Sequence, residues 1–195
     1  MILWTCQEET VYQQLLKTGV YRCDFNLSQM QECREQYDWL VRQMKQRIGP
    51  PPNEVTYPVW AFYQQDGKHR KPDLRRERWA CGCNGARFAC LEIEIPDREV
   101  LLSDFDYWCI ILNNGLLSDT EQEDRCLEAQ YEALSPSEKR RMKDKNWERV
   151  FDLSPLNNGW SRRGYYIQAN FWELRLEQVR DVRFFRAAAK SDSPQ

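Results

Sequence analysis

Charged residues with the spacing of a binding site occur in one short segment, Lys71-Pro72-Asp73-Leu74-Arg75. The prolyl ring stiffens the turn, and the arginine beside it presents a forked guanidinium that suits a phosphate or a carboxylate. The segment lies in the charged stretch 64–78, which is predicted to be a loop. Lys71, Asp73 and Arg75 are therefore candidate ligand-binding residues, and a solvated loop with local salt bridges is the alternative.

Two carboxylates form a second candidate site. Asp104 and Asp106 flank Phe105 directly after the apolar run 100–102. Two carboxylates at the end of a strand can hold a metal, orient a hydroxyl group, or act as acid and base. The alternative is that Asp104 caps a short helix and Asp106 lies in its first turn, which explains both residues without any chemistry.

Metal binding is not expected from the cysteines. Of the eight, only Cys81, Cys83 and Cys90 cluster, and their spacing is not that of paired Cys-x-x-Cys zinc ligands. The single imidazole, His69, would have to complete a site. In a chain long enough to hold itself together without cross-links, we expect free thiols and no metal.

The composition excludes several classes of protein. The 195 residues carry a formal net charge of −2, so no overall field attracts the chain to nucleic acid or to an anionic membrane. No apolar run approaches the roughly 18 residues of a membrane helix, and the first residues lack the pattern of a signal peptide. We expect a cytoplasmic protein. Motifs of phosphate loops, nucleophile elbows, metalloproteases and dinucleotide folds are absent from the sequence.

These candidate residues must be positioned by a mixture of helices and strands. Capping boxes at Ser28/Gln31, Thr120/Glu123 and Ser135/Glu138 mark three helix starts. Helices are predicted over 8–17, 28–48, 120–134 and 136–151, with a short one after residue 103. Strands are predicted over 2–6, 55–63, 87–95, 100–102 and 165–174, the third and fourth adjacent, with a final segment near 179–184 beside the last strand.

The order of these elements favours an α+β fold over a doubly wound parallel sheet. We predict a mixed or antiparallel, possibly split, β-sheet packed against several helices. Residues 1–189 are expected to form a single domain, and 190–195 a disordered tail.

Seven sequence blocks, in this order, resemble the signature of an uncharacterised bacterial family known as a domain of unknown function. They are Leu3-Trp4-Thr5 with Gln7, Arg47-Ile48-Gly49-Pro50-Pro51, Tyr57-Pro58-Val59-Trp60-Ala61, Lys71-Pro72-Asp73-Leu74-Arg75, Leu101-Leu102-Ser103-Asp104-Phe105-Asp106, Trp147-Glu148-Arg149-Val150-Phe151-Asp152, and Gln168-Ala169 with Phe171-Trp172-Glu173-Leu174. The resemblance implies a bacterial cytoplasmic protein and supplies no established activity. This chain has Phe62 and Cys109 where the family pattern has Trp and His. If that histidine is a base or a ligand, this chain lacks it.

A second resemblance concerns the layout of the chain. A first strand, a helix ending in Leu16-Lys17-Thr18-Gly19, and a late strand with Gln168 and Asn170 are similar to small ADP-ribosyltransferases. This resemblance implies an NAD-binding cleft in a split sheet. Such enzymes place Arg or His on the first strand and Glu on a late one. The corresponding candidates here are Thr5 or Gln7, and Gln168, Asn170 or Glu173.

Two functional hypotheses follow. The first is a nucleotide-handling transferase that uses NAD or a related anionic ligand. In this hypothesis the residues that line the pocket are Trp4, Thr5, Gln7 and Trp60, and those that hold phosphate are Lys71 and Arg75. The carboxylate that polarises a ribose hydroxyl is Asp104 or Glu173. Further ligand contacts come from Asp73, Asp106 and Gln168. The second is a non-enzymatic module that binds a protein or a small ligand through the same surface. Convergence of Gln7, Arg75, Asp104 and Gln168 in one cleft would favour the first hypothesis.

Overall fold

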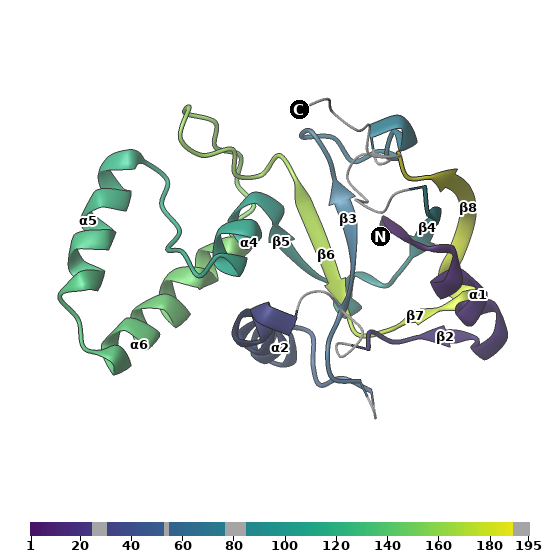
Figure 1. Cartoon of the computed structure of the whole chain (residues 1–195), viewed down its shortest axis with the longest axis horizontal. Coiled ribbons are helices and arrows are strands. Elements are labelled where there is room, and N and C mark those ends of the chain that lie inside the picture. Colours follow the sequence, from purple (N-terminus) through teal and green to yellow (C-terminus); the bar gives the residue numbers. More distant parts are fainter. Residues whose placement is uncertain (25–30, 53–54, 77–84, 189–195) are drawn as a thin grey trace, which may run out of the picture.

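The computed structural model describes residues 1–24, 31–52, 55–76 and 85–188 of the chain. Their fold is α+β, as the sequence predicts, and its centre is a six-stranded sheet in the order β5-β6-β3-β1-β4-β8 (Figure 1). Every strand pair in this sheet is antiparallel. Its strands are β1 (Ile2–Glu8), β3 (Val59–Gln64), β4 (Arg87–Glu94), β5 (Leu101–Asp104), β6 (Ile167–Phe171) and β8 (Val179–Arg186).

Two short strands, which the sequence pattern did not reveal, form a separate two-stranded sheet. These are β2 (Val20–Tyr21) and β7 (Leu174–Arg175). The helices are α1 (Glu9–Thr18), α2 (Arg34–Arg47), α4 (Phe105–Leu112), α5 (Glu121–Glu132) and α6 (Pro136–Trp147), and a 3₁₀ turn, η4 (Glu148–Phe151), follows α6.

Strand β1 lies inside the sheet, as its apolar sequence predicts, but its two neighbours hold it differently. It pairs with β4 along its whole length, from Ile2 to Glu8. With β3 it pairs at a single position, where Trp4 lies opposite Phe62. The hydroxyl of Thr5 donates to the backbone carbonyl of Trp60 over 2.9 Å and satisfies that carbonyl where the pairing ends. The two halves of the sheet therefore meet at a narrow junction.

Two predictions about neighbouring strands are wrong. The strands predicted over 87–95 and 100–102 are β4 and β5, and β1, β3 and β6 lie between them. The chain after β4 turns through a 3₁₀ segment, Asp97–Glu99, instead of a hairpin that would hold the two strands together. The final segment, β8, pairs with β4 and not with β6. Side-chain alternation indicates a strand but carries no information about its partner.

Helix α2 packs its apolar face into one of two core clusters. Leu40 and Met44 are fully buried, in a cluster with residues of helices α4 and α6. The helix begins at Arg34 after a 3₁₀ turn, and the predicted start at 28–30 lies outside the described residues. The polar residue Gln36 is buried too. It lies three and four residues before Trp39 and Leu40, and therefore on the same side of the helix.

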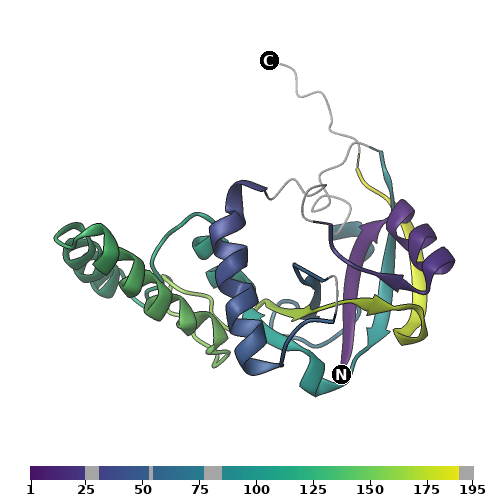
Figure 2. The same ribbon diagram turned by 90° about the horizontal axis from the view of Figure 1, so that it is seen from below.

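Helices α5 and α6 form a hairpin at one end of the molecule, with α2 between the hairpin and the sheet (Figures 1 and 2). Both begin at their predicted caps: Thr120 accepts from the backbone N–H of Glu123, and Ser135 forms a capping box with Glu138. Helix α5 has no buried residue, and α6 buries only Trp147. Among the described residues, no helix has the length and apolar composition needed to cross a bilayer.

Candidate functional site

The two faces of strands β3, β5 and β6 differ in chemistry. Directly opposed residues of antiparallel strands lie on the same face. One face carries the opposed pairs Val59 with Phe171 and Ala61 with Ala169, all buried and apolar. The other face carries Trp60, Phe62, Ser103, Gln168 and Asn170. Leu101, opposite Asn170, and Trp4, opposite Phe62, lie on this face too. We call the first five residues, together with Phe105 at the start of α4, the polar face.

Three side chains of the polar face form a buried hydrogen-bonded cluster. Ser103, Gln168 and Asn170 are only 0%, 2% and 2% exposed. The serine Oγ accepts from Gln168 Nε2 over 3.0 Å and from Asn170 Nδ2 over 3.2 Å. No hydrogen bond between described residues is donated to Gln168 Oε1 or Asn170 Oδ1. Amide oxygens accept hydrogen bonds, so these two oxygens are candidate acceptors for a ligand.

An aromatic row borders this cluster. The ring centroids of Trp60 and Phe62 lie 5.3 Å apart, and those of Phe62 and Phe105 also lie 5.3 Å apart, both in edge-to-face geometry. Trp60 is 39% exposed, although its strand is interior to the sheet. Phe62 therefore places an aromatic ring at the centre of this row. Together, the row and the amides present apolar surface and polar acceptors on one face, as small-molecule sites do.

Asp104 is the N-cap of helix α4. One carboxylate oxygen accepts from the backbone N–H of Tyr107 over 2.9 Å, and the other from that of Gly164 over 2.6 Å. Burial raises the pKa of Asp104, although the N–H groups of Tyr107 and Gly164 act in the opposite direction. Both oxygens hold backbone in place, which is the geometry of the helix-cap alternative.

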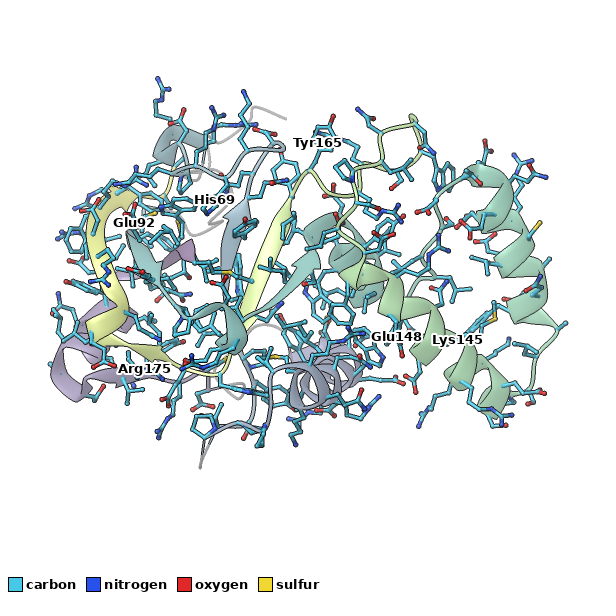
Figure 3. All side chains as sticks on the ribbon, turned by 180° about the vertical axis from the view of Figure 1, so that it is seen from behind. His69, Glu92, Lys145, Glu148, Tyr165 and Arg175 are labelled. Atoms are coloured by element: carbon cyan, nitrogen blue, oxygen red, sulfur yellow. The ribbon has the colours of Figure 1, made fainter. Side chains whose placement is uncertain are left out.

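Asp106 and Arg162 supply charge next to this cap. Burial raises the pKa of Asp106, and the guanidinium of Arg162 opposes that rise. This guanidinium lies over the rings of Tyr165, labelled in Figure 3, and Tyr166, at 5.2 and 5.8 Å from their centroids. It makes no ion pair with any described residue. Sequence reasoning missed Arg162, since it lies in an irregular loop with no motif around it.

Asp66, another residue that sequence reasoning missed, anchors the loop after β3. Its carboxylate accepts from the phenol of Tyr166 and pairs with the guanidinium of Arg76. These two hydrogen bonds lower the pKa of Asp66. The arginine that ties the predicted anion-binding loop to the strand ends is thus Arg76 and not its neighbour Arg75.

Trp4 and Lys71 meet at a carboxylate. The indole Nε1 of Trp4 donates to Glu92 over 3.0 Å, and the ammonium of Lys71 lies 3.0 Å from Glu92 and 3.2 Å from Asp181. The ring of His69 covers Trp4 at a centroid distance of 5.0 Å, and Figure 3 shows His69 and Glu92 near each other. The charge of Lys71 is therefore already balanced by two carboxylates, and Trp4 is buried beneath the loop.

The remaining candidates also have partners within the chain. Gln7 donates to the Thr5 hydroxyl over 2.7 Å, so both support the β1–β3 junction next to Trp60. The side chain of Arg75 is 87% exposed and forms an ion pair with Asp73. Its hydrogen bonds lower the pKa of the Asp73 carboxyl to about 2. Glu173 lies 3.0 Å from Arg22 and 3.6 Å from Arg175.

Gln7, Gln168, Arg75 and Asp104 do not converge in one cleft. Gln168 lies on the polar face opposite Phe62, whereas Thr5 and Gln7 alternate with Trp4 along β1 and lie on the other face of the sheet. Arg75 and Asp104 have separate partners, Asp73 in the loop and the backbone of α4 and Gly164. Ser103 and Asn170 complete the cluster around Gln168. Their proximity depends on strand register, and a one-dimensional pattern does not reveal it.

The cysteines within the described ranges are free thiols: Cys6, Cys23, Cys33, Cys90, Cys109 and Cys126. Among the same residues, no group of three or more His, Cys, Asp and Glu side chains could hold a metal ion. Cys81 and Cys83 lie outside the described residues. Burial raises the pKa of Cys109, as do the charges of Asp106 and Asp104, so this thiol is protonated near neutral pH.

Comparisons with known proteins give a family and no relative of established activity. A search of curated proteins and a search of solved structures each returned no match. One family model matches residues 2–180, which include all of the helices described above and every strand except most of β8. The chain therefore belongs to the family described as Domain of unknown function (DUF3841).

Proposed function

We propose that the polar face binds the planar ring of a nucleotide-like ligand, with NAD as the first candidate. One observation carries the proposal: the buried cluster of Ser103, Gln168 and Asn170 shares a face of the sheet with the partly exposed Trp60. A core built only for stability would place apolar residues here, as the opposite face of the same strands does.

The chemistry of the face fits a heteroaromatic amide or amine. A flat ring packs on Trp60 and Phe62, and an N–H group of the ligand donates to Gln168 Oε1 or Asn170 Oδ1. Both the carboxamide of nicotinamide and the amino group of adenine are donors of this kind. The amide oxygens therefore favour such ligands over purely apolar rings.

The phosphates of the ligand require a cation whose charge is not already balanced. Lys71 and Arg75, the sequence candidates, each contact carboxylates. Arg162 stacks on tyrosines and interacts with the carboxylates of Asp66 and Asp106 only at a distance, without an ion pair to a described residue, so its N–H donors remain available for a phosphate. We therefore assign the phosphate contact to Arg162.

Any transfer reaction also requires a carboxylate beside the ribose. Asp104 and Glu173 are occupied by backbone N–H groups and arginines. Asp106, beside the aromatic row, replaces them as the residue we propose to polarise a ribose hydroxyl. The alternative, a binding module without chemistry, is favoured by the structural contacts of Asp104 and Glu173. Release of nicotinamide from NAD by the parent, abolished in Asp106→Asn, would distinguish the enzyme from the module.

A thermal-shift screen tests the binding proposal. NAD, ATP, ADP-ribose and nicotinamide are added separately, and a ligand at about 100 times its Kd should stabilise the fold by about 2.7 kcal/mol, or about 5–10 °C. Gln168→Leu should lose that shift, because it removes the amide oxygen. Lys17→Ala, at the exposed end of α1, should keep it. No shift with any of the four ligands, or an equal shift in Gln168→Leu, would refute the proposal.

A further inference from the structure

A groove of about 340 Å³ lies between helices α2 and α6, apart from the polar face. Trp39, Arg42, Gln43 and Gln46 line it from α2, and Arg141, Asp144, Lys145 and Glu148 line it from α6 and the first residue of η4. Figure 3 shows Lys145 and Glu148 on this part of the chain. The lining residues follow helical spacing on both sides, so the groove is a seam between two helix faces.

The charges in the groove are incompletely paired. Arg42 and Asp144 face each other across the seam at 3.6 Å. Arg141, Lys145 and Glu148 line the same groove, and none of them makes an ion pair or a side-chain hydrogen bond with another described residue. Two cations and one carboxylate of the groove therefore make no ion pair within the described part of the chain.

The base of the groove contains an unsatisfied donor. The Trp39 side chain is 1% exposed, and its indole Nε1 has no hydrogen-bond partner. Other buried indoles in the described ranges do have one: Trp147 donates to Gly115 O over 2.8 Å, and Trp172 to Gly49 O over 3.1 Å. Leaving a buried donor unsatisfied is costly, and this cost is recovered when a ligand supplies an acceptor.

We propose that this groove binds a small oxyanion, a phosphate or carboxylate group, held by Arg141 and Lys145 with one oxygen accepting from Trp39 Nε1. An oxyanion supplies the acceptor that the indole lacks and the charge that the two cations lack. Because Trp39 Nε1 is covered in the empty groove, binding moves one of the long side chains of the lining aside. The negative charge of Glu148 repels the anion and lowers its affinity for the groove.

Phosphate and carboxylate share this chemistry, and the experiment separates them. Inorganic phosphate and malonate are titrated separately into ¹⁵N-labelled protein, and the indole N–H signal of Trp39 is followed by NMR. Trp39→Phe assigns the signal and keeps an aromatic ring against Phe151. Binding should shift this signal with saturation, and the tighter of the two anions identifies the class of ligand.

Three exposed variants provide the decisive comparison, each titrated by calorimetry with the same two anions. Arg141→Ala with Lys145→Ala should weaken binding about tenfold or more, because both charge-assisted contacts are lost. Glu148→Gln should tighten it, because a repelling charge is removed. Arg125→Ala, a matched control on α5 that pairs with Glu121, should bind like the parent. The proposal is overturned if neither anion moves the Trp39 signal, or if the double variant binds as well as the parent.

Discussion

At the scale of single residues, the sequence allows two interpretations of some polar side chains, one functional and one structural, and only their contacts decide between them. Asp104 fits both a catalytic carboxylate and a helix cap in sequence. Its two carboxylate oxygens accept hydrogen bonds from the backbone N–H groups of Tyr107 and Gly164, so the side chain positions α4 and the loop before β6. The polar face shows the opposite case. Gln168 has a buried amide whose oxygen receives no hydrogen bond from the described residues.

Substitutions at Asp104 should affect stability first. Asp104→Ala removes a cap and leaves the Gly164 N–H without an acceptor, so we expect a loss of about 2–4 kcal/mol in the free energy of unfolding. Asp104→Asn keeps one acceptor oxygen and should lie between the parent and the alanine variant. Urea unfolding measures the order. An alanine variant as stable as the parent but unable to bind the ligand would return Asp104 to the list of functional residues.

The pH dependence of stability should depend on Glu92. Burial raises the pKa of this carboxyl, but hydrogen bonds from Trp4 and Lys71 outweigh burial and leave it below its ordinary value of 4.5. Because the folded pKa is lowered, the contribution of Glu92 is present above pH 4.5 and is lost as the pH falls through the folded value.

Glu92→Gln should therefore lower the unfolding free energy near neutral pH and make its decline in acid less steep. Urea unfolding of the parent and the variant, measured from about pH 7 down to about pH 3, gives both curves. The difference between them should shrink as the pH falls. A constant difference over that range would contradict the role of the ionised carboxylate.

At the scale of elements, local chemistry predicted most helices and strands, and tertiary contacts decided the rest. The caps at Thr120 and Ser135 begin α5 and α6 as predicted, because capping is satisfied within a few residues. The predictions of which strands lie beside β5 and β8 were wrong, since strand pairing depends on residues far along the chain. The candidate site has the same limit: Trp60 and Gln168 were identified from sequence, whereas Ser103 joins them only through the register of β5 with β6.

The buried face of α2 predicts a clear contrast between two leucines. Leu40 is 0% exposed in the core beside α4, whereas Leu16 on α1 is 45% exposed. Leu40→Ala should cost about 2–5 kcal/mol, because the cavity adds to the lost transfer energy. Leu16→Ala should cost under about 1 kcal/mol, as surface changes do. Thermal or urea unfolding of both variants checks this, and equal losses would contradict the core assignment.

The loop before β6 contains a matched pair of glycines. Gly164 has φ +80°, and a Cβ there would lie 2.9 Å from the carbonyl oxygen of Leu153. Gly159 has φ +84° but no atom within 4 Å of its Cβ position. Gly159→Ala should cost about 1 kcal/mol from backbone strain alone. Gly164→Ala should cost clearly more, because the rigid backbone must also move and the bond to Asp104 is strained. Similar losses in urea unfolding would contradict the close packing of this loop.

At the scale of the whole molecule, the sheet and the helical hairpin carry separate candidate sites. Helix α2 lies between them and contributes to the core that joins the two parts (Figure 1). The α+β class followed from the order of elements, and an antiparallel sheet was one of the two arrangements predicted, but the order of the strands was not predicted. The two proposed sites share no residue, so each can be tested without disturbing the other. The polar face carries the central claim, because its buried amides are not explained by stability alone.

Titration calorimetry of NAD into the parent and two tryptophan variants tests that claim most directly. Trp60 and Trp160 are 39% and 47% exposed, so replacing either by alanine should leave the fold intact. We expect Trp160→Ala to bind NAD like the parent, because Trp160 lies outside the polar face. Trp60→Ala should bind at least about tenfold more weakly, since a stacked ring contributes about 1–3 kcal/mol. Equal affinity of Trp60→Ala and the parent for NAD would contradict ligand binding on the polar face.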